Sequence, residues 1–326
     1  EPEGYQTDQV YPNGMSTSLP EDVQLEMIHS IAGLENAQVM KFGYGIEHTV
    51  IEPTQLFPSL QTKRIKNFFT AGQINGTTGY EEAAAQGLVA GINAALAAQG
   101  REAMILDRAS SYIGVLIDDL TTKGTSEPYR MFTSRVEYRL LLREDNADLR
   151  LASAGHEAGL ISGAAYRRVK EKSEEIKQCI SMLGKSFIKP DAEVNAKLAL
   201  LKTSPLKKKT ALEDLLKRPE ITFKDLKGFS SADLDVQAVV ALQAEIEVKY
   251  KGFIQRQMSE VDRFENLEKI RLPSDMDYAP ISGLSKEIKE KLLRFKPLNL
   301  GQASRISGVT PAAIAILMVY LKKIHG

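Results

Sequence analysis

The spacing of apolar positions divides the chain into two parts. In residues 1–152, short apolar runs alternate with glycine-rich turns, a pattern that is typical of an α/β domain. From about residue 153 clear strand runs stop, and long charged stretches with helical spacing take over. The helices predicted there cover residues 164–183, 211–217 and 238–270. We therefore expect an α/β domain, 1–152, followed by an all-α domain, 153–326.

The first part is organised around residues 66–99. The apolar run at 65–70 has the length and composition of a buried strand, and a glycine-rich turn follows it. Thr78 and Glu81 have capping-box spacing, so we expect a helix to begin there. The glycines of the turn are Gly72, Gly76 and Gly79. Strand, turn and capped helix are what a nucleotide or flavin site needs, although an ordinary β–α connection has the same pattern.

Three further elements are expected in this part. A helix over 21–30 follows Ser18 as a candidate N-cap, and residues 36–47 alternate as a strand does. The amphipathic pattern of 107–123 predicts a helix, with Asp118 and Asp119 on its solvent side.

The segment 136–143 fits two structures. Its even positions are all apolar, which favours a strand, whereas Arg135, Arg139 and Arg143 lie four residues apart, which favours a helix. Either structure places the three arginines on one side, where guanidinium groups can bind phosphates. The acidic residues that can pair with them instead are Glu137, Glu144 and Asp145. Both interpretations stay open, and they can coexist.

The chain ends in a basic segment. Residues 271–326 hold nine Lys and Arg against four Asp and Glu, a net charge of +5. Residues 300–309 predict a helix and a glycine turn, after which Thr310 and Pro311 supply the N-cap and first position of a new helix. Such a basic bundle can bind nucleic acid or dock a protein partner. The run Lys207-Lys208-Lys209 can likewise contact RNA or be a solvated loop.

Composition excludes several classes of site. The formal net charge is zero, so RNA binding must depend on local basic patches. Cys179 is the only cysteine, which excludes an intrachain disulfide and a cysteine-based zinc site and fits a reducing cytoplasm. No apolar run approaches the roughly 18–20 residues of a membrane span, and no signal-peptide pattern is present. The four histidines lack metal-ligand spacing, so no metal site is expected.

Three stretches resemble the bacterial GidA/MnmG family. They are Ala-Gly-Gln-Ile-Asn-Gly-Thr-Thr-Gly-Tyr-Glu-Glu-Ala-Ala-Ala-Gln-Gly at 71–87, the segment 124–150 that begins Gly-Thr-Ser-Glu-Pro-Tyr-Arg, and Gly-Gln-Ala-Ser-Arg-Ile-Ser-Gly-Val-Thr-Pro at 301–311. The resemblance spans the whole chain. Family members begin with a GxGxxG dinucleotide motif, which this sequence lacks. We therefore expect the C-terminal half of such an enzyme, namely the closing part of a Rossmann-like FAD-binding domain followed by a helical domain.

The resemblance implies a function. The family's enzymes use FAD, NADH as reductant and a folate one-carbon donor to add a (carboxymethyl)aminomethyl group to C5 of the wobble uridine of tRNA. They act in the cytoplasm as homodimers with the tRNA-modification GTPase MnmE (TrmE). The helical part, with its basic terminal bundle over about 271–326, is expected to bind tRNA or that partner. The isolated chain is expected not to bind FAD, because the phosphate-cradling loop is absent.

The resemblance also implies site residues. Gln73 is expected at the flavin, and Asn75, Gly76, Thr78 and Gly79 are expected to shape the turn or present main-chain amides to it. The residues expected to contact phosphates or tRNA are Arg130, Arg135, Arg139, Arg143, Lys291, Arg294, Lys296 and Arg305. No catalytic base or nucleophile can be assigned. Two alternatives remain: a folate- and FAD-dependent tRNA uridine methyltransferase, whose members usually lack the long helical C-terminus, and a non-catalytic module that binds tRNA or protein.

Overall fold

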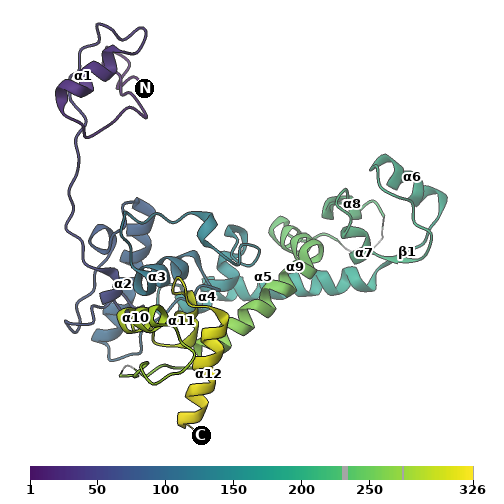
Figure 1. The fold of residues 1–326 in the computed structure, drawn as a ribbon. Helices are drawn as coiled ribbons and strands as arrows, with labels where there is room; N and C mark the ends of the chain where they lie inside the picture. Colours follow the sequence, from purple (N-terminus) through teal and green to yellow (C-terminus); the bar gives the residue numbers. More distant parts are fainter. Residues whose placement is uncertain (230–233, 274, 326) are drawn as a thin grey trace. The chain divides into compact units, whose positions relative to one another are not determined.

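The computed structural model describes residues 1–229, 234–273 and 275–325 (Figure 1). The chain forms two compact units, residues 1–49 and 50–326. In the first unit, the predicted helix is present as α1 (Glu21–His29). Its N-cap is Pro20 and not Ser18, and it has no side-chain cap. The Gln24 amide fixes the surrounding loop, because its Nε2 donates to the carbonyls of Leu19 (2.6 Å) and Gly43 (2.9 Å).

The second unit is mainly helical. Its helices are α2 (Tyr80–Ala98), α3 (Tyr112–Lys123), α4 (Ala147–Glu157), α5 (Gly163–Lys185), α6 (Ala192–Leu200), α7 (Leu212–Leu216), α8 (Phe223–Leu226), α9 (Ala238–Glu268), α10 (Lys286–Phe295), α11 (Leu300–Arg305) and α12 (Pro311–His325). Short 3₁₀ turns are η1 (Pro53–Gln55), η2 (Gly72–Asn75), η3 (Thr133–Arg135) and η4 (Glu144–Asn146). The predicted helices over 107–123, 164–183, 211–217 and 238–270 are confirmed in position, with small changes at their ends.

The predicted strands are wrong in detail. Residues 36–47 form none, and residues 65–70 contribute only an isolated bridge between Gln61 and Phe69. The neighbouring residues 60–62 do bond to this run, since the Thr62 N–H donates to the Phe68 carbonyl (2.8 Å) and the Thr70 N–H to the Leu60 carbonyl (3.2 Å), but the pairing stops after one bridge and forms no regular strand. Among the described residues, the one regular strand pair joins β1 (Phe187–Ile188) to β2 (Thr210–Ala211), antiparallel, inside the region where helices alone were predicted.

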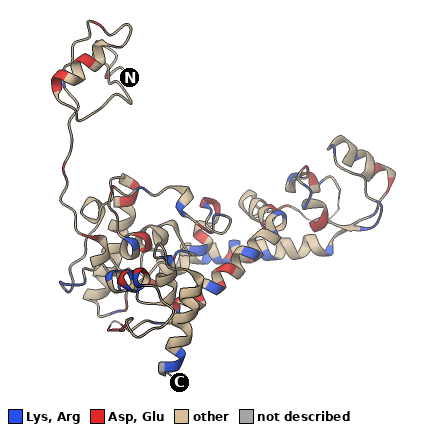
Figure 2. Ribbon diagram, viewed as in Figure 1, with Lys and Arg blue, Asp and Glu red and all other residues tan. Residues whose placement is uncertain are grey.

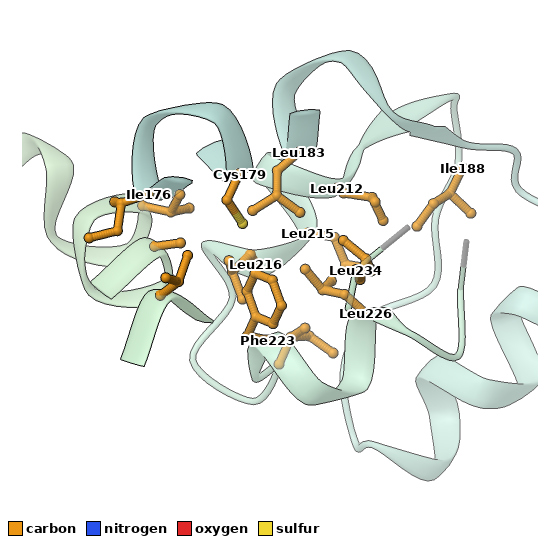
Figure 3. Close-up of a cluster of buried hydrophobic side chains, with 14 of the residues drawn as sticks. Ile176, Cys179, Leu183, Ile188, Leu212, Leu215, Leu216, Phe223, Leu226 and Leu234 are labelled. Atoms are coloured by element: carbon orange, nitrogen blue, oxygen red, sulfur yellow. The ribbon is translucent and has the colours of Figure 1, made fainter. Parts of the chain in front are cut away.

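Helices α5, α7 and α8 and the first part of α9 share an apolar core (Figure 3). On α5 the apolar positions Ile176, Cys179 and Leu183 recur at three- and four-residue steps and so share one face. That face meets leucines of α7, and Phe223 and Leu226 of α8 close the cluster. Burial raises the pKa of the Cys179 thiol. This cysteine is therefore a core residue, as expected of a thiol with raised pKa in apolar surroundings.

The last three helices form a second core with residues that follow α9. Ser285 caps α10 and Asn299 caps α11, each by accepting a main-chain N–H (3.3 and 2.8 Å). The predicted start of the final helix is confirmed, since Thr310 Oγ1 accepts the Ala313 N–H (3.3 Å) and Pro311 is the first residue of α12. Across the residues that the structure describes, no helix combines the length and the apolarity that a bilayer span requires.

We expect the substitution Leu216→Ala to lower the free energy of unfolding by about 2–5 kcal/mol, because this side chain is completely buried in the α5–α9 core. The matched control is Leu200→Ala, whose side chain is 83% exposed and should change stability by less than about 0.5 kcal/mol. Urea unfolding of the 326-residue chain, followed by circular dichroism, makes the comparison. Equal losses for the two variants would contradict the described core.

Candidate functional site

The glycine turn before α2 depends on backbone conformations that favour glycine. Gly72 and Gly76 both have left-handed backbone angles, with φ of +81° and +84°. A Cβ on Gly76 would also lie 2.7 Å from Thr125 Cγ2. Gly79 has an ordinary φ, but a Cβ there would overlap the carboxylate of Glu82. The three predicted glycines are thus required by conformation at two positions and by space at the third.

A network of buried amides holds this turn. Asn75 donates through Nδ2 to the Thr70 carbonyl (2.8 Å) and to Gln86 Oε1 (2.7 Å), and accepts from Thr70 Oγ1 (2.7 Å). Gln86, from α2, also accepts the Gly72 N–H (3.2 Å) and donates to Thr77 Oγ1 (2.9 Å). The Asn75 side chain therefore points into the protein and shapes the turn.

The other side of the turn is exposed. Gln73 and Thr78 are exposed, and the Tyr80 side chain is 93% exposed at the start of α2. The predicted capping box is wrong, because the N-cap is Gly79 and no side chain caps the helix. The first main-chain hydrogen bond of α2 runs from the Ala83 N–H to the Gly79 carbonyl (3.1 Å). The N–H groups of residues 80–82 therefore have no acceptor within the helix.

In place of the predicted capping box, Glu82 is the side chain that bonds the first turn of α2 to a neighbouring loop. This carboxylate is 3% exposed, and its Oε1 accepts the Met131 N–H (2.7 Å) and the Arg130 Nε–H (3.3 Å). Burial opposes its ionisation, but the Met131 amide and the Arg130 charge outweigh burial and lower the pKa of Glu82. Glu82 thus fastens the loop at 130–131 to the first turn of α2 and neutralises part of the positive potential there.

A second buried carboxylate, Asp119, connects that loop to α3. Tyr129 donates its hydroxyl to Asp119 Oδ2 (2.9 Å), while Arg108 and Lys123 each reach Oδ1 (2.7 Å). Burial alone would raise the pKa of Asp119, but Arg108 and Lys123 outweigh it and hold the pKa below its ordinary value. Burial and the Asp119 charge raise the pKa of Tyr129. Since the Tyr129 N–H also donates to the Gly76 carbonyl (2.8 Å), the glycine turn is tied to this network.

The network continues into the terminal bundle. Arg108 Nη1 also reaches Asp118 Oδ2 (3.1 Å), and the other oxygen of Asp118 accepts from Arg305 of α11 (2.8 Å). Arg305 also pairs with Glu268, the last residue of α9 (2.9 Å). Arg305 is therefore buried between two carboxylates, and a contact with RNA would require both ion pairs to break.

The remaining predicted arginines do not form one row, because residues 136–143 are neither helix nor strand. Arg135 lies over the ring of Tyr129, 4.3 Å from its centroid, and Arg139 is exposed. Arg143 pairs with Asp145 (2.9 Å) and donates to Gln243 of α9 (2.9 Å). Of the predicted acidic partners, Asp145 is thus used, whereas Glu137 pairs with Arg108 (2.7 Å).

The predicted basic residues of α10 lie on or beside that helix. Lys291 Nζ is held by Glu287 (2.6 Å) and by the Ser307 carbonyl (2.7 Å). Arg294 and Lys296 are exposed, with Lys296 in the left-handed conformation that ends α10. Lys63 and Lys296, although far apart in sequence, line the same small cavity, and burial and then the charge of Lys296 lower the pKa of Lys63.

Sequence reasoning missed Arg108, Asp119, Tyr129 and Glu82. For Asp119 a signal was available: it follows Val115 by four residues and Leu116 by three, so it belongs on the apolar face of α3 and not on the solvent side. Arg108, 11 residues before Asp119, carried no comparable signal, because only the tertiary fold brings it to α3.

Three family models of known proteins match most of the chain. Residues 1–102 match a family model described as glucose inhibited division protein A. Residues 164–258 and 260–326 match the C-terminal helical domain and the C-terminal helical bundle of the tRNA modifying enzyme MnmG/GidA. The chain belongs to the MnmG/GidA family. These matches confirm the predicted order, in which a GidA portion precedes a helical C-terminal region.

Individual relatives agree. The tRNA uridine 5-carboxymethylaminomethyl modification enzyme MnmG of Exiguobacterium sibiricum is 53% identical over 323 residues, which are 99% of this chain and 51% of that protein. The enzyme of the same name from Geobacillus thermodenitrificans is 53% identical over the same shares. Among solved structures, Aquifex aeolicus GidA in its form II crystal has a TM-score of 0.79 at 47% identity, covering 98% of this chain and 51% of that one. The chain thus spans about half the length of the curated relatives it matches.

We expect Gly79→Ala to destabilise the chain, and less so when Glu82 is already Ala. In the otherwise unchanged chain the new Cβ displaces a carboxylate that is held by the Met131 amide, whereas in Glu82→Ala that carboxylate is gone. Thermal unfolding of the two single variants and the double variant forms a double-mutant cycle, with an expected coupling of about 0.5–3 kcal/mol. Additive losses would show that Glu82 is not the reason for glycine at position 79.

We expect Asp119→Asn to lower stability at pH 7 by about 3–5 kcal/mol, because it leaves buried Arg108 and Tyr129 without their shared anion. Since folding depresses the Asp119 pKa, its contribution is present above the ordinary value of 3.8 and is lost as the pH falls below it.

The parent chain should therefore lose more stability than Asp119→Asn between pH 5 and pH 3, measured by urea unfolding. Asp262→Asn, on an exposed position of α9, is the control and should follow the parent chain. Parallel curves for the parent chain and Asp119→Asn would contradict the assignment.

Proposed function

We propose that this chain is part of a flavin-dependent enzyme that adds a (carboxymethyl)aminomethyl group to C5 of the wobble uridine of tRNA. The names of the MnmG relatives, 53% identical along nearly the whole chain, support this proposal. The observation on this chain that carries it is the glycine turn, with one face fixed by buried Asn75 and Gln86 and the other exposed at the start of α2.

We propose that the exposed face of the turn lies along one edge of the bound FAD. The amides at the start of α2 and the exposed Gln73 and Thr78 offer hydrogen-bonding groups to the edge of a flavin ring, and Gln73 adds no charge. Two cavities of this unit, of about 10 and 30 Å³, are lined by other residues. In this proposal the chain contributes one wall of the flavin site. When bound, FAD supplies the redox chemistry. NADH as reductant and a folate one-carbon donor complete the proposed reaction.

The terminal bundle is proposed to meet tRNA or the GTPase MnmE in a homodimeric, cytoplasmic assembly. Arg294 and Lys296 are exposed and Lys291 is partly exposed, so these side chains can reach a phosphate backbone. Arg305 has a different role in this proposal. Because it joins α11 to Asp118, it couples the position of the bundle to the network that reaches the glycine turn.

The alternative functions would leave the wobble uridine in different chemical states. A folate- and FAD-dependent methyltransferase would leave a methyl group at C5, and a non-catalytic module would leave the uridine unchanged. The match of residues 164–326 to helical models named for MnmG/GidA favours the first proposal over the methyltransferase.

The test incubates the complete flavin-loaded protein and its GTPase with unmodified tRNA, NADH, the folate donor and an amino-group source. The tRNA is then digested, and the masses of its nucleosides are measured by mass spectrometry. A wobble uridine with the mass of the (carboxymethyl)aminomethyl product, or of its aminomethyl form, is the expected result. A mass gain of one methyl group would favour the methyltransferase, and an unchanged uridine would favour the module.

Replacing Lys291, Arg294 and Lys296 together with alanine is expected to weaken tRNA binding and to make the log–log salt slope of the binding constant shallower. The slope should change by roughly 0.7 for each phosphate that the protein no longer neutralises. Labelled tRNA titrated at several salt concentrations provides the measurement. Unchanged affinity and unchanged salt dependence would reassign these residues to partner docking.

A further inference from the structure

Four lysines gather where the β1–β2 pair opens. The register pairs Phe187 with Ala211 and Ile188 with Thr210, so the next residues along the two strands are Lys189 and Lys209. Lys207 and Lys208 precede Lys209, and all four side chains are exposed. Figure 2 colours every Lys and Arg blue and every Asp and Glu red, in the view of Figure 1. We call these four residues, with the adjacent Phe187, the lysine patch.

The backbone of the lysine patch is anchored on both sides. Before it, Leu206 is buried, and its main-chain N–H donates to Asn195 Oδ1 (2.8 Å) while its carbonyl accepts from Asn195 Nδ2 (3.4 Å). After it, Thr210 is paired with Ile188 and donates its hydroxyl to the Lys208 carbonyl (2.9 Å). The lysine run is thus held between two fixed points, which distinguishes it from a freely solvated loop.

The acidic residues nearby are already engaged. Asp191 caps α6 by accepting the Val194 N–H (2.8 Å), and Glu193 pairs with Lys197 (2.8 Å). Glu213 pairs with Lys251 (3.1 Å) and Asp214 with Lys217 (2.8 Å). Within the described ranges of the chain, none of the four lysines of the patch has an ion pair.

The local charge is therefore strongly positive. Residues 185–211 contain seven lysines and two acidic residues. Placing like charges at neighbouring strand positions raises the energy of the free protein. An anion bound across the patch would remove that repulsion.

We propose that the lysine patch is an RNA-binding surface, which contacts phosphates of the tRNA away from the nucleotide that is modified. This inference rests on the proposed function, since it names a further surface for the same substrate. Lysines bind a phosphate backbone as point charges and without base specificity. Phe187, 53% exposed and with Lys209 Nζ 4.6 Å from its ring centroid, adds an aromatic face on which an unpaired base can stack.

The composition of the patch favours RNA over an acidic protein. Protein interfaces are depleted in lysine, and their energy comes from buried aromatic and arginine anchors surrounded by apolar contacts. The patch has one exposed ring and four ammonium groups that make no ion pair with any residue that the structure describes. This arrangement matches the electrostatic attraction that supplies most non-specific affinity for nucleic acids.

The test compares two triple variants of the complete protein. The first is Lys207→Gln, Lys208→Gln and Lys209→Gln, and the matched control is Lys217→Gln, Lys227→Gln and Lys251→Gln. The control removes the same charge from lysines of the same helical region whose ammonium groups are already paired with Asp214, Asp235 and Glu213. Fluorescence anisotropy of labelled tRNA is recorded between about 50 and 300 mM salt.

The patch variant is expected to bind tRNA about tenfold or more weakly near 0.15 M salt, and its log–log salt slope should be shallower by about 2. The control should differ from the parent protein by less than about threefold. The variant Lys207→Arg, Lys208→Arg and Lys209→Arg keeps the charge and should bind as the parent does. Circular dichroism checks that all variants fold. If the glutamine triple is unstable, Lys189→Gln is used instead, with an expected change in slope of about 0.7.

A patch variant that matches the control in both affinity and slope would overturn this inference while leaving the proposed function standing, provided that the parent protein binds and modifies tRNA. Polyglutamate serves as a second probe, standing for an acidic protein. If the patch variant loses binding to polyglutamate but keeps its affinity for tRNA, the inference is overturned in favour of an acidic protein partner. A parent protein that binds no tRNA would overturn both proposals.

Discussion

The structure of the glycine-turn region depends on keeping the buried carboxylate of Asp119 charged. Removing a carboxylate from water is costly unless cations and hydrogen-bond donors replace its hydration. Arg108, Lys123 and the Tyr129 hydroxyl supply that replacement from three places in the sequence. Because each of them must come within hydrogen-bond reach of one side chain of α3, the segment before α3 and the loop after it are placed together. A single desolvated charge thus organises backbone that has no regular secondary structure.

Residues 50–80 likewise contain little regular secondary structure. Within the part that the structure describes, isolated bridges stand where a sheet was expected, and side-chain amides take over the role of a strand ladder. Asn75 and Gln86 satisfy main-chain groups that an adjacent strand would otherwise have bonded. The turn is therefore defined on its inner face by specific side chains, which leaves its outer face free for a ligand. Glycine is favoured at 72 and 76 because their φ values of +81° and +84° lie in a region that residues with a side chain rarely adopt.

How much the sequence could predict follows from the range of the interactions involved. Helices α3, α5 and α9 were predictable because their apolar positions recur with a local period. The strand predicted over 65–70 does not form, because its main-chain bonds to residues 60–62 stop after one bridge, which the apolar pattern alone does not reveal. Asp119 was assigned to solvent although its spacing from Val115 places it on the apolar face of α3. The sequence marks Asn75 and Gly76 as residues of the glycine turn, but nothing local shows that the Asn75 amide reaches Gln86. The lysines at 207–209 were visible as a charge run, while their anchoring by Asn195 required the fold.

The ion pair between Arg305 and Asp118 has a consequence for biosynthesis. These residues are 187 positions apart, so at about 5–20 residues per second a ribosome needs roughly 10–40 s after Asp118 to supply its arginine partner. During that interval Arg108 is the arginine that pairs with Asp118. A product cut short before α11 never acquires this ion pair. Without α11, Asp118 of α3 and Glu268 of α9 therefore lack the single arginine that pairs with both of them.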